Sequence, residues 1–144
     1  MPTTIRQAQQ LQQRIDLPLA VLPQQQRQES DERQPARHGD PARGRTIATD
    51  GNRGNCVACH VMPLDDVEGY GTIGPTLAGI GGRYPEGYIR LRVVDTKSFN
   101  PASIMPGYYR DPAKIHRPAK MLQGRTFLTA QQVEDVIAFL VTMK

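Results

Sequence analysis

Aromatic residues and cysteines are scarce in this sequence. Its 144 residues include no tryptophan, three phenylalanines and two cysteines, and aromatic residues make up only 6% of the chain. Hydrophobic residues account for 38%, which is little for a domain of this length that must build its core from side chains alone. The length predicts one domain, and the composition predicts that something besides side chains fills part of its core.

Long hydrophobic runs are lacking too. A membrane-spanning helix needs about 18 or more consecutive apolar residues, and no stretch of this sequence approaches that length. The first residues also lack the uninterrupted apolar segment of a secretory signal peptide. We therefore expect no transmembrane span, and we expect a processed or trimmed form if the chain acts outside the cytoplasm.

Acidic residues are outnumbered by basic ones, 14 to 18, which gives a net charge of +4. A basic surface could attract an acidic partner protein or a nucleic acid. The sequence has no recognisable nucleic-acid-binding motif and no row of basic residues with interleaved aromatics, so nucleic-acid binding is not expected. The alternatives that remain are a docking surface for a protein and an ordinary solvated surface.

Residues 1–37 differ in composition from the rest of the chain. They are rich in glutamine, and residues 24–37 contain almost no apolar side chains, which predicts a solvated arm or linker. A short amphipathic helix could form within residues 1–21, and Pro23 would end it. We assign residues 1–37 to an N-terminal arm and residues 38–144 to the folded domain.

Both cysteines belong to one motif, Cys56-Val57-Ala58-Cys59-His60. The C-x-x-C-H spacing is typical of c-type haem attachment, in which each thiol forms a thioether to one haem vinyl group. The adjacent imidazole of His60 would bind the iron from one side. One covalently bound haem c would also supply the buried apolar volume that the side chains lack, so the apoprotein should fold poorly.

Two other interpretations of the cysteine pair rank behind haem attachment. A thioredoxin-like redox pair would need a βαβ pattern nearby, and none is recognisable. A zinc site would need a second pair of Cys or His ligands at suitable spacing. The other histidines, His38 and His116, lie far apart and alone.

The pattern after residue 38 predicts an all-α domain. The order of its segments resembles that of class I cytochromes c, which implies about three to five short helices around one haem. Asp40 and Pro41 suit the N-cap and first turn of a helix that runs to about Asp50. A second helix is predicted over residues 85–94. We expect its Arg90 and Arg92 to form a docking surface or to be simply solvated.

The chain should end with an amphipathic helix. The sequence Thr129-Ala130-Gln131-Gln132 is a capping box. The apolar positions that follow repeat with helical spacing and predict a face that packs on the first helix near Gly44. This face consists of Val133, Val136, Ile137 and Leu140.

Residues 71–77 predict a tight loop because they combine glycine and proline. A metal-bound histidine normally donates its second ring N–H to a carbonyl, and the turn at Pro75 is the best source of that acceptor for His60. Arg83 and Tyr84 follow, and either side chain could reach a haem propionate. Arg83 would do so through a charge-assisted hydrogen bond.

A second axial ligand should come from a later loop. Met105, in Ile104-Met105-Pro106, offers a soft thioether in a segment that proline stiffens, and His/Met ligation raises the reduction potential of the iron. Met121 competes for this role because it stands closer to the last helix. His116 is a third option. We rank Met105 ahead of Met121.

The region from Gly39 to Lys144 resembles the SoxX subunits of SoxXA cytochrome complexes, which act in thiosulfate oxidation. The resemblance is carried by the attachment motif and by several more specific segments. These are Gly39 to Arg45, Gly82-Arg83-Tyr84, residues 89–95, residues 100–109, residues 123–129 and residues 133–136. It implies that Met105 is the distal ligand, although residues 110–121, with their extra methionine, depart from the family pattern.

The resemblance also implies partners and a cellular location. It implies a periplasmic electron-transfer subunit of an L-cysteine S-thiosulfotransferase whose catalytic haem lies on a dihaem or monohaem SoxA-like subunit. That enzyme couples thiosulfate oxidatively to a cysteine of a SoxY-type carrier protein. The SoxX-like chain would pass the released electrons to a small soluble cytochrome. The alternative is a free-standing class I cytochrome c that shuttles electrons without an enzyme partner.

Overall fold

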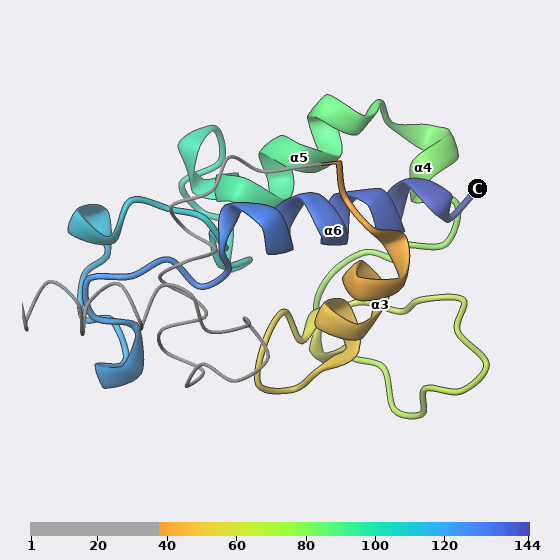
Figure 1. Cartoon of the computed structure of the whole chain (residues 1–144), viewed down its shortest axis with the longest axis horizontal. Helices are drawn as coiled ribbons and strands as arrows, with labels where there is room; N and C mark the ends of the chain where they lie inside the picture. The colour runs from red at the N-terminus through yellow and green to blue at the C-terminus, as the bar shows by residue number, and fades with distance from the viewer. Residues whose placement is uncertain (1–37) are drawn as a thin grey trace, which may run out of the picture. The chain divides into compact units, whose positions relative to one another are not determined.

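A computed structural model describes residues 38–144, and Figure 1 shows a helical arrangement. Its α-helices are α3 (Pro41–Thr49), α4 (Ile80–Arg83), α5 (Glu86–Asp95) and α6 (Ala130–Thr142). Four short 3-10 helices join them: η2 (Cys56–Ala58), η3 (Thr96–Ser98), η4 (Pro112–Lys114) and η5 (Lys120–Leu122). No strand occurs in this part of the chain, which confirms the predicted all-α class.

Two earlier predictions fall wholly or partly outside residues 38–144. The arm over residues 1–37 and its short helix lie outside the described residues, so the domain boundary stays a prediction. Within the described residues, no helix has the length and apolar character needed to cross a bilayer.

Helix α3 begins where the sequence predicts. The Asp40 carboxylate accepts hydrogen bonds from the backbone N–H groups of Ala42 at 2.9 Å and Arg43 at 3.1 Å, so two of the free donors at the helix start are satisfied. Pro41 occupies the first turn, where its missing N–H costs nothing. Asp50 caps the other end, as expected.

Helix α6 forms the centre of the core. Its capping box is present, with Thr129 Oγ1 accepting from Gln132 N at 3.2 Å and Gln132 Oε1 accepting from Thr129 N at 2.9 Å. The predicted apolar face is buried, because none of its side chains exceeds 4% exposure. These side chains are Val133, Val136, Ile137 and Leu140.

Helices α3 and α6 cross in close contact at Gly44, as the sequence predicts (Figure 1). A Cβ atom on Gly44 would lie only 1.8 Å from the backbone oxygen of Asp135. A Cβ atom on Gly39 would lie 2.0 Å from the backbone oxygen of Glu134. Any larger residue at either position would push α3 away from α6.

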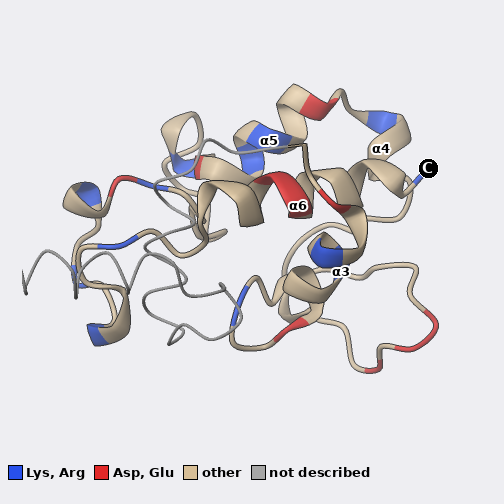
Figure 2. Cartoon of the chain, in the orientation of Figure 1, with Lys and Arg blue, Asp and Glu red and all other residues tan. Residues whose placement is uncertain are grey.

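Two neighbouring carboxylates of α6 bind the helices on either side, and Figure 2 shows this acidic pair between basic residues. Asp135 accepts from Arg43 Nε at 2.9 Å and from the backbone N–H of Asp40 at 2.8 Å, which ties α3. Glu134 accepts from Arg90 Nε at 2.9 Å and from its Nη2 at 2.7 Å, which ties α5. Arg90 therefore joins α5 to α6 through an ion pair, whereas we expected a docking surface or a solvated side chain.

Helix α5 matches the predicted position, with Pro85 as its N-cap. Its buried residues are Ile89 and Val93, and Thr96 continues this face just after the helix with 2% exposure. This face closes one side of a cavity between α5, α6 and the loops that precede and follow them.

Candidate functional site

A cavity of about 730 Å³ opens in the core. Its walls are mainly apolar, and they bring together segments from residue 55 to residue 140. The polar, sulfur-bearing and aromatic side chains on these walls include Cys56, Cys59, His60, Arg92, Thr96, Met105 and Tyr108. The volume and the mix of apolar walls with few polar groups are typical of a cofactor site.

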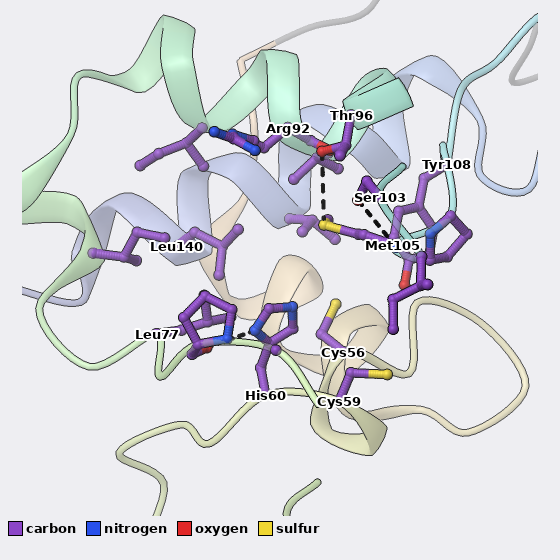
Figure 3. Close-up of a pocket in the computed structure, with 18 of the residues that line it drawn as sticks. Cys56, Cys59, His60, Leu77, Arg92, Thr96, Ser103, Met105, Tyr108 and Leu140 are labelled. Carbon is purple, nitrogen blue, oxygen red and sulfur yellow. Dashed lines mark hydrogen bonds between the residues drawn. The ribbon is translucent and has the colours of Figure 1, made fainter. Parts of the chain in front are cut away.

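The attachment motif lies at one edge of this cavity (Figure 3). Asn55 adopts a left-handed conformation with φ of 45°, and the chain then turns through η2. The N–H of Cys59 bonds to Cys56 O at 3.2 Å, and the N–H of His60 bonds to the same oxygen at 3.0 Å. This tight turn places both thiols and the imidazole on the cavity wall.

The chemistry of Cys56 does not suit a redox dithiol. Neither Cys56 nor Cys59 is in a disulfide. Burial raises the pKa of the Cys56 thiol to about 11, so at neutral pH it is protonated. Reactive cysteines have lowered pKa values instead. In residues 38–144, no three His, Cys, Asp or Glu side chains gather as metal ligands.

The His60 ring is held in one orientation and one tautomer. Its Nδ1 lies 2.7 Å from the carbonyl oxygen of Pro75, the acceptor that the sequence predicts. Because a carbonyl only accepts, Nδ1 carries the proton, and Nε2 keeps a lone pair for a metal. Figure 3 shows the ring reaching into the cavity.

Gly74 packs directly against the His60 imidazole. A Cβ atom on Gly74 would lie 2.3 Å from His60 Cε1 and 2.5 Å from Nδ1, so no side chain fits there while the ring keeps its place. The N–H of Gly74 also bonds to Cys59 O at 2.7 Å. The loop that supplies the Pro75 carbonyl is thus bound directly to the attachment motif.

Met105 faces His60 from the opposite wall, and Figure 3 shows its sulfur turned toward the cavity. The hydroxyl of Thr96 lies 3.9 Å from this sulfur and donates to Arg92 O at 2.9 Å. The N–H of Met105 bonds to Ser103 Oγ at 3.2 Å, which fixes the start of the loop turn. The structure therefore brings the two expected donors, one nitrogen and one sulfur, to facing walls.

The competing ligands lie elsewhere. Met121 belongs to η5, is 75% exposed and does not line the cavity. His116 is exposed and also lies outside the cavity lining.

Arg83 does not line the cavity either. Its Nη2 donates to Thr76 O at 3.0 Å, which braces the loop next to Pro75. The neighbouring Tyr84 does line the cavity, and its ring stacks on Tyr88 with centroids 4.7 Å apart. Of the pair that we expected near a haem propionate, only Tyr84 reaches the cavity.

Sequence reasoning missed Arg92 as a site residue. This guanidinium lines the cavity, with its Cζ 4.9 Å from the ring centroid of Tyr88 and 4.3 Å from that of Phe99. The contact between the cation and two rings holds the charge in place, and it contradicts our expectation of a docking or solvated residue. The spacing of Tyr88 and Arg92, one helical turn apart, is the signal that could have revealed it.

The residues present fit a covalently attached haem. Two thiols lie at one edge, a nitrogen and a thioether sulfur face each other across the cavity, and the walls between them are mainly apolar. Histidine and methionine are the axial pair of c-type cytochromes, and thiols two residues apart suit the two vinyl groups. The glycine under His60 and the hydrogen bond to Pro75 hold the nitrogen donor ready.

Comparisons with known proteins agree with this geometry. The model of the family described as cytochrome c matches residues 41–144. A solved chain from the crystal structure of SoxXA from P. pantotrophus is 40% identical, with a TM-score of 0.68. That match covers 75% of this chain and 84% of the solved chain. No curated protein matches the sequence significantly.

Proposed function

Because the chain belongs to the cytochrome c family and is a SoxX-like cytochrome, we propose that it is the monohaem electron-accepting subunit of a SoxXA-type complex. In this proposal, the complex couples thiosulfate oxidatively to a cysteine of a SoxY-type carrier protein. The chain takes up the released electrons and passes them to a small soluble cytochrome. The observation that carries the proposal is the opposition of His60 and Met105 across the cavity.

The cytochrome c domain implies covalently bound haem c. Cys56 and Cys59 would hold it through thioethers, and His60 Nε2 and Met105 Sδ would bind its iron. When bound, the haem supplies a one-electron iron couple whose potential depends on its axial ligands and surroundings. We propose one haem, because the sequence contains one attachment motif.

The side chains around the cavity support electron transfer rather than substrate turnover. His60 and Met105 occupy the two facing walls, so the donor set leaves no open position of the kind that catalytic metal sites keep. The Pro75 carbonyl holds the His60 tautomer, and the apolar walls keep water away. Arg92 would supply a fixed positive charge for a haem carboxylate.

The sequence also supports a division of labour with a partner. Its two cysteines are both in the attachment motif, so no further thiol is present for sulfur chemistry. Thiosulfate chemistry would therefore take place on a SoxA-like subunit, and the solved relative comes from a structure described as SoxXA. Because c-type haem is attached outside the cytoplasm, we propose a periplasmic location.

Reconstitution tests this function. The haem-loaded chain and a SoxA-like subunit are expressed separately and together in the periplasm, and thiosulfate-dependent reduction of a small soluble cytochrome is followed with a carrier protein present. We expect the chains to co-purify, the pair to show turnover, and the isolated chain to be red but inactive. Turnover by the isolated chain, or failure of the two chains to associate, would contradict the proposal.

A further inference from the structure

Tyr108 occupies a special place between the two walls of the cavity. Its side chain lines the cavity but is almost fully buried, with 7% exposure. Its hydroxyl donates to the backbone oxygen of Gly54 at 2.6 Å. Its ring packs edge-on against Phe127, with centroids 5.3 Å apart. The hydroxyl is therefore aimed at Gly54 by packing, and both partners are shielded from water.

The Gly54 end of this hydrogen bond is rigid. The N–H of Gly54 bonds to Ile47 O at 3.0 Å, at the end of α3. A Cβ atom on Gly54 would lie 2.8 Å from the same oxygen, so the backbone is pressed against that helix. Gly54 stands two residues before Cys56, so Tyr108 is bound to the frame that carries the attachment motif.

Other backbone hydrogen bonds of the Met105 loop run to α5 and to the segment before α6, where the N–H of Leu128 bonds to Tyr108 O at 2.9 Å. The N–H of Tyr108 bonds to Val93 O and that of Tyr109 bonds to Val94 O, each at 3.1 Å, at the end of α5. Ser103 Oγ, which holds the N–H of Met105, lies within the loop itself. Among the hydrogen bonds shown for residues 38–144, the Tyr108 hydroxyl alone joins residues 99–109 to residues 50–77.

We propose that Tyr108 is a positioning residue whose hydroxyl bond to Gly54 keeps the Met105 loop closed and so limits how readily Met105 leaves the iron. This inference rests on the proposed function, because it takes Met105 as the axial ligand. The loop is fixed to α5 at its end, and the Tyr108 bond fixes it to the wall that presents His60. Without that bond, no hydrogen bond shown for residues 38–144 joins the Met105 loop to the wall that presents His60.

Removing the hydroxyl should favour the open loop. Tyr108→Phe keeps the ring and its packing on Phe127 but leaves Gly54 O buried without its donor. An unsatisfied buried carbonyl is costly, so the closed arrangement loses free energy relative to an open one in which water reaches the oxygen. An external ligand that binds only when Met105 has left gains apparent affinity in proportion to the open fraction.

The test uses the haem-loaded ferric protein and free imidazole as the probe. Imidazole is titrated while the absorption band at the red end of the visible spectrum, which reports the Met–iron(III) bond, is followed. We expect Tyr108→Phe to bind imidazole about tenfold more tightly than the wild type. The matched control is Tyr109→Phe, because Tyr109 is 40% exposed, and the imidazole affinity of this variant should be unchanged.

Thermal unfolding followed by circular dichroism separates positioning from a purely structural role. A lower unfolding temperature with unchanged imidazole affinity in Tyr108→Phe would overturn the inference. If the Met–iron(III) absorption band of the wild type persists in Met105→Ala, the ligand assignment in the proposed function would be overturned instead. The two failures are thus distinguishable.

A second measurement on the wild-type holoprotein applies if Tyr108→Phe does not fold. Amide hydrogen exchange is compared with and without imidazole. We expect exchange to rise both in residues 99–109 and around Gly54, because opening of the loop breaks the bond that joins them. A rise confined to residues 99–109 would overturn the inference.

Discussion

The two walls of the cavity are built in different ways. On the His60 wall, backbone bonds join residues 57–61 to residues 71–77, at Gly71 N–Val57 O, Gly74 N–Cys59 O and Leu77 N–Val61 O. On the Met105 wall, an irregular loop without long helices presents the sulfur, and side chains such as Tyr108 and Ser103 hold it. Three backbone hydrogen bonds between two segments therefore fix the His60 donor, whereas Met105 is held by side-chain bonds and by the backbone bonds of Tyr108 and Tyr109 to α5.

The largest expected effect tests the Met105 wall itself. Met105→Ala should abolish the far-red Met–iron(III) band and lower the reduction potential, because the soft thioether that favours reduced iron is gone. Met121→Ala is the matched control, because Met121 is exposed and outside the cavity. Absorption spectroscopy of both ferric variants checks this. The reverse pattern would transfer the ligand role to Met121.

On the His60 wall, Gly74→Ala should strongly disturb the position of the His60 imidazole. The added methyl group would lie 2.3 Å from His60 Cε1, so the ring must move and weaken its bond to Pro75 O. We expect a changed ferric spectrum and a lower unfolding temperature. Gly82→Ala is the control, because its Cβ would meet only an atom 3.9 Å away. Equal changes of the ferric spectrum and the unfolding temperature in the two variants would contradict the close packing of Gly74 on His60.

The sequence was most informative where function depends on neighbours in the chain. The motif from Cys56 to His60 is contiguous, and the capping box and apolar spacing of α6 are local patterns. The attachment motif and the last helix could therefore be predicted from the sequence. The close crossing of α3 and α6 at Gly44 was predictable from the small residue, although Gly44 meets Asp135 and Phe139 rather than the apolar stripe of α6. The cofactor class and the helical fold were therefore predictable before any tertiary contact was known.

The rest depended on how distant segments meet. Met105 and Met121 both lie in irregular segments, and only their tertiary placement separates a cavity-lining sulfur from one that is 75% exposed. Likewise, Arg83 stood close to the right loop in sequence, yet its side chain turns to Thr76 O outside the cavity. Arg92 reaches the cavity because the rings of Tyr88 and Phe99 hold it there. Phe99 lies beyond α5, so helical spacing does not reveal its contact with Arg92.

A smaller effect is expected at the two ion pairs that join α6 to its neighbouring helices. Asp135 binds Arg43 of α3 and has a side-chain exposure of 3%, whereas Glu134 binds Arg90 of α5 and has a side-chain exposure of 24%. Asp135→Asn should lower the free energy of unfolding by about 2 kcal/mol, and Glu134→Gln by about 1 kcal/mol or less. Urea unfolding of the holoprotein at neutral pH measures both. A larger loss in Glu134→Gln would reverse the ranking.

Asp135 also predicts a pH dependence. Burial alone would raise the pKa of its carboxyl, but hydrogen bonds from Arg43, the Asp40 N–H and Gln131 outweigh burial and hold the pKa below its usual value. Because the folded pKa lies below the unfolded one, this stabilisation is present above the unfolded pKa and is lost as pH falls through the folded pKa. The wild type should therefore lose more stability on acidification than Asp135→Asn. Parallel pH curves would contradict this.

The smallest effect concerns the fixed cation on the Met105 wall. Arg92→Gln should lower the reduction potential by on the order of 50 mV, because a nearby positive charge favours the reduced state. Arg83→Gln should change it much less, because that guanidinium lies outside the cavity. Spectroelectrochemical titration at fixed ionic strength gives both values. A larger shift in Arg83→Gln would restore the role that the sequence suggested for it.

The intact mass of the denatured protein tests the central claim most directly. The chain is expressed in the periplasm of a host that attaches c-type haem, and it is then unfolded so that only covalent groups remain. The account predicts the polypeptide mass plus one haem, because Cys56 and Cys59 both bind it. A colourless protein with the mass of the polypeptide alone would contradict the account.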